Sequence, residues 1–362
     1  MKRPWAVLFG CGLVIGVTLL LRSSLLDDPP GREAPIEGSI AESPIVAPTL
    51  GWLSFDTTWA GSAIYEPSAV EALPDGRFLV AQDEAGDPFV LLSLPGLGEG
   101  SAIRPTVGAG LLRPDRPAAP ASALDLSDLE GLARAADGYL FAITSHSQTE
   151  QGERRIAREK LARLRIEGDT IVEYGAHKGL REEILAAHPE LEAAMRSKNS
   201  KGRKGFSIEA LAVGRDGHSL WIGLRGPIID GDAWIIVLEN PNAVFEDNAP
   251  PSFGEPLRLD LDKGGIRALS FVPPLDGYVL VSQRADKKDS SDEAFELWFW
   301  RGGDSDEAEG LDPDGLDLRK TEGVTLARHQ GEDYLLLVSD DGEAGSRHFA
   351  HYRLLPLSAL AD

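Results

Sequence analysis

Residues 206–226 read FSIEALAVGRDGHSLWIGLRG, in which a glutamate, Glu209, stands directly before an apolar run that breaks at Asp216 and Gly217. The apolar residues on either side of this dipeptide read as two short β-strands. Asp-Gly supplies the positive φ that a two-residue hairpin turn requires, so the stretch predicts a β-hairpin with Glu209 at its start. Taken alone, Glu209 is a solvated strand end, and the rest of the chain decides whether it is more.

The same arrangement occurs five times along the chain. The copies are PSAVEALPDGRFLVAQD from Pro67, LEGLARAADGYLFAITSH from Leu129, IEALAVGRDGHSLWIGLR from Ile208, IRALSFVPPLDGYVLVSQR from Ile266 and TEGVTLARHQGEDYLLLVSD from Thr321. The second residue of each copy forms a polar column, which consists of Ser68, Glu130, Glu209, Arg267 and Glu322. Self-similarity of this kind indicates a repeat architecture.

The segments between the copies indicate how the repeats are arranged. Most copies are followed by further strand-like segments, and four short antiparallel strands repeated around an axis are typical of a β-propeller. The last copy is followed only by HFAHYRLLPL from His348, whereas GWLSFDTTW from Gly51 precedes the first. We therefore predict an all-β propeller of five blades, in which the strand near Gly51 completes the last blade. Six blades and a Greek-key sandwich are the alternatives.

One segment, residues 179–204, interrupts the pattern with GLREEILAAHPELEAAMRSKNSKGRK. Its apolar residues Leu180, Ile184 and Leu185 fall at helical spacing, so we predict a helical insertion between the second and third blades. The segment ends in a basic tail, for which an exposed loop is the simplest interpretation. The residues of this tail are Arg196, Lys198, Lys201, Arg203 and Lys204.

The N-terminal residues predict export. Residues 1–24 begin with Lys2 and Arg3 and then run uncharged from Pro4 to Leu21, which is long enough to cross a slightly thin bilayer. We predict an uncleaved signal anchor, with a cleaved signal peptide as the alternative. The positive charges before the span place the rest of the chain outside the cytoplasm, in the periplasm or beyond. Residues 25–50 predict a flexible tether, and residues 51–362 the propeller.

Composition narrows the classes of function. The chain has 36 basic and 58 acidic residues and a net charge of −22, so its surface repels polyanions and nucleic-acid binding is excluded. Cys11 is its single cysteine, so no disulfide is expected in the exported part. We expect a monomer that takes a small or phosphate-containing ligand.

Hairpin geometry predicts where polar residues gather. The start of a blade's first strand and the end of its second lie at the same face, because the two strands are antiparallel. One rim should then carry Glu130, Glu209, Arg267 and Glu322 innermost, with the second-strand ends around them at Asp83, His146, Arg225, Arg284 and Asp340. The candidate catalytic residues are Glu130, Glu209, Arg267, Glu322, His146 and Arg225. The candidate metal ligands are Glu130, Glu209, Glu322 and Asp340.

Converging carboxylates need a cation, which is either Arg267 or a hard metal ion such as calcium. In the first case, Arg267 ties the glutamates into a plug of ion pairs that closes the channel. His146 is the histidine best placed for proton transfer, with a structural role as the alternative. The loop GERRIARE brings arginines that bind a phosphate or carboxylate if it folds over the rim; these are Arg154, Arg155 and Arg158.

The motifs SHSQTEQGERRIAREKLARLRI, KGFSIEALAVGRDGHSLWIGLRGP, GGIRALSF, TEGVTL and LLLVSDDG, in this order, resemble the bacterial family called domain of unknown function 3616. More distantly, the Glu-Gly strand starts resemble the esterase-like phytase propellers. The resemblance covers roughly residues 66–354 and implies a propeller. It also implies a polar site of Glu130, Glu209, Arg267 and Glu322, with Arg225 and His146 nearby. This chain departs from the family's Asn-Ile-Glu-Gly, because residues 207–210 read Ser-Ile-Glu-Ala.

Two classes of function stay open from the sequence. The first is a calcium-dependent hydrolase of phosphate or carboxylic esters, in which Arg225 or Arg267 stabilises the developing oxyanion. The second is a non-catalytic, membrane-tethered propeller that binds a ligand or acts as a scaffold.

Overall fold

The computed structural model of this protein describes residues 49–52, 64–83, 88–93, 106–111, 113–114, 124–149, 151–168, 170–196, 205–284, 294–313, 316–329, 331–342 and 350–360. All of them belong to one compact unit, residues 45–362. No helix among them is long and apolar enough to cross a membrane. The predicted signal anchor and nearly all of the predicted tether lie outside the described residues, so both stay predictions.

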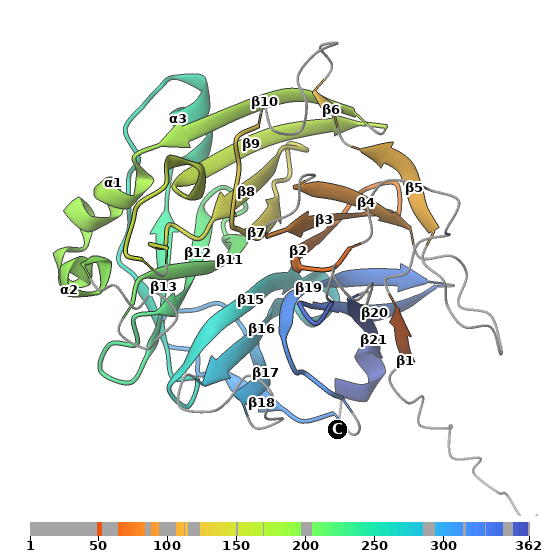
Figure 1. The fold of residues 1–362 in the computed structure, drawn as a ribbon. Helices are drawn as coiled ribbons and strands as arrows, with labels where there is room; N and C mark the ends of the chain where they lie inside the picture. The colour runs from red at the N-terminus through yellow and green to blue at the C-terminus, as the bar shows by residue number, and fades with distance from the viewer. Residues whose placement is uncertain are drawn as a thin grey trace, which may run out of the picture. The chain divides into compact units, whose positions relative to one another are not determined.

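Five sheets, one for each sequence copy, make up the described part of the chain (Figure 1). Blade 1 contains β2 (Pro67–Ala72), β3 (Phe78–Gln82), β4 (Phe89–Ser93) and β5 (Thr106–Leu111). Blade 2 contains β7 (Leu129–Arg134), β8 (Leu140–Thr144), β9 (Lys160–Glu167), β10 (Thr170–Lys178) and the short β6 (Arg113–Pro114). Blade 3 contains β11 (Ser207–Val213), β12 (Leu220–Gly226), β13 (Ala233–Leu238) and β14 (Leu257–Leu259). Blade 4 contains β15 (Gly264–Val272), β16 (Gly277–Arg284), β17 (Phe295–Trp300) and β18 (Glu309–Leu311). Blade 5 contains β19 (Thr321–His329), β20 (Glu332–Ser339), β21 (His351–Pro356) and β1 (Thr49–Trp52).

The inner strands of the blades form a closed ring. Strand β2 contacts β7, β7 contacts β11, β11 contacts β15, β15 contacts β19, and β19 contacts β2 again. The prediction of a propeller with five blades is therefore confirmed. Strand β1 pairs antiparallel with β21, so the N-terminal strand completes the last blade as predicted, although it begins two residues before Gly51 and ends at Trp52.

The hairpin turns of blades 1 to 4 are longer than we predicted. In blade 1, the N–H of Gly76 donates to the carbonyl of Leu73 (3.1 Å), and the turn's positive φ is that of Gly76, 84°. This is the three-residue loop in which a type I turn ends in a glycine bulge. Gly138 and Gly217 have the same role, with φ of 88° and 73°. In blade 4, Asp276 itself has positive φ, 47°. The two-residue turn was wrong because the dipeptide alone does not show where strand pairing ends.

In every blade, the inner strand has a β-bulge at the same position of its ladder with the second strand. The ladder skips one residue of the inner strand in every blade, and these residues are Ser68, Glu130, Glu209, Arg267 and Glu322. In blade 3 it also skips Arg225 of the second strand. The polar column of the sequence is therefore the set of bulged residues. A bulged residue has no direct partner across the ladder, and the bulge changes the direction in which its side chain points. This is why the repeat sets these side chains apart from the apolar run that follows.

Below the bulges, the inner strands close the axis with small residues. An added Cβ on Gly131 would lie 2.7 Å from Cβ of Leu211, and one on Gly323 would lie 2.7 Å from Cγ2 of Val338. Glycine after the bulged glutamate is therefore a packing requirement in blades 2 and 5. Blade 3 has Ala210 there instead, and its methyl group faces Gly223, where a Cβ would lie 2.8 Å from that of Ala210.

Apolar side chains between neighbouring blades form the core that holds the ring. The second strands β3 and β8 are buried over their whole length, with the sequences FLVAQ and LFAIT. Between blades 2 and 3, Ile143 and Leu161 pack in one cluster with Leu220 and Trp234. Burying such side chains removes apolar surface from water at about 25 cal/mol per Å², so blade contacts stabilise the ring in place of disulfides.

The predicted helical insertion is present between blades 2 and 3. It contains α1 (Leu180–Ala187), the 3₁₀ turn η3 (Pro189–Leu191) and α2 (Glu192–Met195). Buried Leu180 and Ile184 join the core of the two blades. Buried Arg181 donates from Nη2 to the carbonyl of Met195 (2.6 Å) and from Nη1 to the carbonyl of His146, which ties the insertion to the loop after β8. The basic tail beyond Arg196 lies outside the described residues.

Candidate functional site

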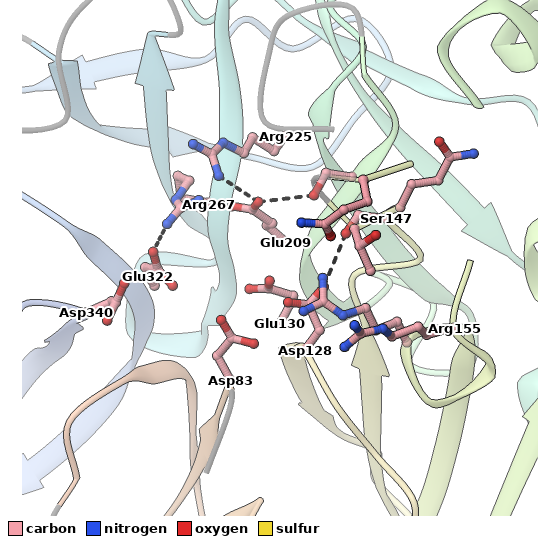
Figure 2. A pocket seen from close by; sticks show the side chains of 15 residues that line it. Asp83, Asp128, Glu130, Ser147, Arg155, Glu209, Arg225, Arg267, Glu322 and Asp340 are labelled. Carbon is pink, nitrogen blue, oxygen red and sulfur yellow. Dashed lines mark hydrogen bonds and ion pairs between the residues drawn. The ribbon is translucent and has the colours of Figure 1, made fainter. Parts of the chain in front are cut away.

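A pocket of about 290 Å³ opens at the rim where the inner strands begin (Figure 2). It is lined by the bulged residues Glu130, Glu209, Arg267 and Glu322. Asp83, Arg225 and Asp340, which follow or end second strands, line it too. The other lining residues are Asp128, Ser147, Gln148, Thr149, Gln151, Arg155, Arg158 and Ser207. The structure thus brings together most of the residues that hairpin geometry placed on the rim.

Arg267 lies at the centre of the rim and holds two of the glutamates. Its guanidinium forms ion pairs with Glu209 and with Glu322. Arg267 and Glu209 are buried, and Glu322 is partly buried. Arg225 donates to the other oxygen of Glu209 (2.9 Å), and Ser207 Oγ donates to the same oxygen (3.1 Å). Burial alone would raise the pKa of Glu209, but the charges of Arg225 and Arg267 lower it below its ordinary value. Glu209 is therefore an anion fixed between two cations.

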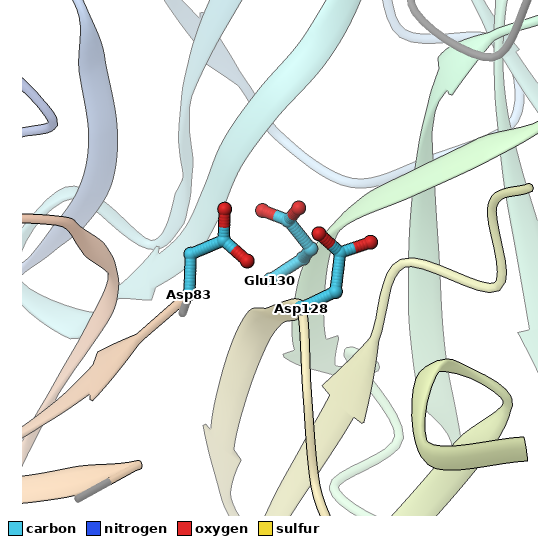
Figure 3. A group of neighbouring side chains, drawn as sticks. All are labelled: Asp83, Asp128 and Glu130. Carbon is cyan, nitrogen blue, oxygen red and sulfur yellow. The ribbon is translucent and has the colours of Figure 1, made fainter. Parts of the chain in front are cut away.

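A second group of carboxylates stands apart from this network (Figure 3). Ligand oxygens of Asp83, Asp128 and Glu130 all lie within 4.8 Å of one another. Burial, then the negative charges of Glu209, Asp128 and Asp83, raises the pKa of Glu130 well above its ordinary range, and Arg267 offsets only part of this. Glu130 therefore favours its protonated form unless a further cation joins the trio of Asp83, Asp128 and Glu130.

Asp128 is the most constrained member of the trio. Its Oδ2 accepts hydrogen bonds from the hydroxyls of Ser145 and Ser147, and lies 3.2 Å from Nη1 of Arg158. Asp128 has positive φ, 63°, which aspartate tolerates better than most residues. These contacts fix the carboxylate through Oδ2 alone.

The loop GERRIARE folds over the rim. This is the condition under which we expected its arginines to bind a phosphate or carboxylate. Arg155 and Arg158 line the pocket, and Figure 2 shows Arg155 beside Asp128. Arg154 lies elsewhere, because it pairs with Glu159 (2.6 Å, Nε to Oε1) and with Glu182 (2.5 Å). The loop therefore adds two cations to the pocket.

Two residues that we expected on the rim lie away from the pocket. His146 is fully buried, its Nδ1 lies 2.7 Å from the carbonyl of Thr144, and burial lowers its pKa to about 4. His146 does not line the pocket, so the structure does not place it where we expected it to transfer protons. Arg284 pairs with Asp262 outside the pocket.

The expected metal-ligand set is also rearranged. Glu130 lies in the trio, but Glu209 and Glu322 are paired with Arg267. Asp340 lines the pocket outside the trio, and its pKa is raised to about 6, mainly by burial, while Lys320 and Arg267 offset part of the rise. Arg267 causes this difference, because it forms ion pairs with Glu209 and Glu322 and leaves Glu130 to lie with Asp83 and Asp128.

Sequence reasoning missed Asp128 and Ser147. Asp128 stands just before the second copy and was left out of the aligned columns, and Ser147 lies in the loop after the second strand. The available signal was SDLEG, which sets a second carboxylate two residues before Glu130. Alternation along a strand would place both at one face, although the bulge and the positive φ of Asp128 had no signal of their own.

Comparisons with known proteins give a local match to one family and distant likenesses to solved structures. No curated protein matches the chain. One matching solved structure is an exo-β-1,3-galactanase from Phanerochaete chrysosporium, with 8% identity over 86% of this chain and 64% of that one and a TM-score of 0.47. Another is a GH43 β-1,3-galactosidase, with 13% identity over 84% of this chain and 94% of that one and a TM-score of 0.46. A third is the major Malassezia sympodialis allergen Mala s 1, with 15% identity over 80% and 77% and a TM-score of 0.40. Likenesses this distant do not bear on what this chain binds or catalyses.

The family comparison is more local and more direct. The matched residues, 167–249, run from the end of β9 through the insertion to the residues after α3 (Pro241–Glu246). They include Glu209 and Arg225 of the pocket. The resemblance of this chain to the family described as protein of unknown function, DUF3616, is confirmed by the match of that family's model to residues 167–249.

Proposed function

We propose that this propeller is a calcium-dependent hydrolase that cleaves phosphate or carboxylic esters in the rim pocket. The observation that carries the proposal is the trio of Asp83, Asp128 and Glu130, whose ligand oxygens lie within 4.8 Å of one another. Calcium binds oxygens at about 2.3–2.6 Å, so two oxygens on one ion lie at most about 5 Å apart. The separation and the donor chemistry fit such an ion, and its positive charge would favour the ionised form of Glu130.

The rest of the pocket supports an anionic ester as the substrate. A calcium ion at the trio would supply positive charge that draws the ester's oxygens and favours attack by water. Arg155 lies on the same side of the pocket as the trio, and its guanidinium suits a phosphate or carboxylate. Arg225 is held in place by Glu209 and lines the pocket, so its positive charge would stabilise negative charge that develops during the reaction.

Hydrolysis by the full chain tests the proposal. The protein is stripped of calcium with a chelator and assayed with p-nitrophenyl phosphate, inositol hexakisphosphate and p-nitrophenyl acetate while calcium is added back. We expect turnover of at least one ester that requires calcium, together with a rise in melting temperature, since calcium binds the folded state only. Asp83→Asn should abolish both effects. Asp262→Asn, which removes a carboxylate outside the pocket, should leave both intact.

A non-catalytic binding or scaffold propeller is the second candidate. The observation that favours it is Arg267, which ties Glu209 and Glu322 into a fixed, buried network of ion pairs. In addition, the described residues that line the pocket include no histidine and no cysteine. A calcium-dependent rise in melting temperature without turnover of any ester would favour this candidate. A protein that neither turns over an ester nor responds to calcium would contradict the hydrolase.

A further inference from the structure

The axis of the ring has a second mouth, at the ends of the inner strands farthest from the bulges. Between the mouths, a space of only about 10 Å³ lies among small and apolar side chains of the inner strands. This volume is about that of one water probe, so no ligand passes from one mouth to the other. The far mouth is a separate cavity of about 340 Å³, within the usual range for small-molecule pockets.

The far mouth is mostly apolar, in contrast to the rim pocket. Inner strands of several blades contribute Leu211, Val213, Leu269 and Leu326 to its wall. Phe271 stands at this mouth and is 36% exposed, and among the described large hydrophobic residues only Ile156 is also exposed. Exposed apolar surface that is gathered at a cavity commonly marks a binding site.

Two polar residues, Arg134 and Glu71, also line the far mouth. Arg134 donates from Nε to the carbonyl of Ala72 (3.0 Å), and its terminal nitrogens have no hydrogen-bond partner within the described part of the chain. Burial raises the pKa of the neighbouring Glu71 to about 8, and the charge of Arg134 and the N–H of Ala72 offset part of the rise. At neutral pH, Glu71 is therefore a neutral donor beside a cation.

The other charged side chain among the described lining residues is already engaged. Arg215 donates from Nη2 to both carboxylate oxygens of Asp276 (3.0 and 3.1 Å) and from Nη1 to the carbonyl of Arg301. Arg134 is thus the cation that faces the cavity with donors to spare. An apolar cavity with one such cation and one neutral carboxyl suits an anion with an apolar body.

We propose that the far mouth binds a small amphipathic carboxylate. Its apolar body lies against Leu211, Leu269 and Phe271, and its carboxylate accepts hydrogen bonds from Arg134 and Glu71. The site is separate from the rim pocket and requires neither calcium nor ester hydrolysis, so it stands whether or not the proposed hydrolase activity does.

Three ligands with the same apolar chain test the charge requirement. Octanoate, octanol and octylamine are titrated into the full chain by calorimetry at pH 7. We expect octanoate to bind at least fivefold more tightly than octanol, and octylamine to bind most weakly. Above pH 8, Glu71 ionises and repels the ligand, so octanoate affinity should fall about tenfold between pH 7 and pH 9, because the protonated fraction falls tenfold per unit above the pKa.

Variants separate the parts of the proposed site. Arg134→Met should remove the preference for octanoate over octanol without changing octanol binding, and Glu71→Gln should remove the fall in affinity above pH 8. Phe271→Ser should weaken octanoate and octanol alike. Arg284→Met, an arginine change outside the cavity, is the matched control and should change nothing. Tighter binding of octylamine than octanoate, or no binding of any of the three ligands by a folded wild type, would overturn the proposal.

Discussion

Arg267 determines how the carboxylates of the rim pocket are divided. It stands in the polar column where blades 2, 3 and 5 have glutamate, and it pairs with two of those glutamates while the third joins Asp83 and Asp128. The sequence predicted both a cation plug and a metal site as alternatives for the same three glutamates. The structure places an ion-pair network and a carboxylate trio side by side in one pocket, so the two ideas apply to different residues.

Replacing Arg267 tests this division. In Arg267→Met, buried Glu209 and partly buried Glu322 lose a partner, so we expect the free energy of unfolding to fall by about 3–5 kcal/mol at neutral pH. Arg267 helps hold the pKa of Glu209 below its ordinary value, and the stability this provides is present at neutral pH and lost as pH falls through that pKa. The deficit of the variant should therefore shrink towards pH 4, as measured by urea unfolding at both pH values.

A control variant shows whether the loss of stability is specific to the pocket. Arg284→Met removes an arginine that pairs with Asp262 at the surface, and exposed ion pairs contribute about 0–1 kcal/mol. A loss in Arg267→Met that is no larger than in this control, or that does not depend on pH, would contradict the role of Arg267 as the partner of buried glutamates.

At the scale of elements, the inner strands show which signals a sequence carries. The repeat predicted the strands, their order and the polar column, because apolar alternation and turn residues are local. The bulges at that column were not predicted, since a bulge is a property of two paired strands. For the same reason the turns of blades 1 to 4 were predicted too short. Asp128 was missed because its position depends on how the loop after blade 1 meets β7.

Strand β1 provides the test at this scale. Deleting residues 49–52 leaves β21 as an unpaired edge of the last blade. The lost ladder hydrogen bonds are each worth about 1 kcal/mol, so we expect the melting temperature to fall by roughly 5 °C or more. Deleting residues 40–43, a segment of equal length in the predicted tether, should change it little. Equal melting temperatures for the two deletions would contradict the closing role of β1.

At the scale of the whole molecule, the acidic composition and the N-terminus bear on where the propeller works. We propose that the chain is a monomer, anchored by residues 1–24 with the propeller outside the cytoplasm. Fractionation of cells that make the full chain should place it with the membrane, and protease added from outside should digest the propeller. A soluble exported product that begins near residue 23 would show cleavage instead.

The five bulges have a consequence for how this protein changes over time. A bulged residue has no direct partner in the ladder, so its side chain can be exchanged without altering the pairing that holds the blade together. The chain already carries serine, glutamate and arginine at these equivalent places. Natural variation, or a designer, can therefore change the charges around the axis without altering the strand pairing, provided that Arg267 and the glutamates it pairs with change together.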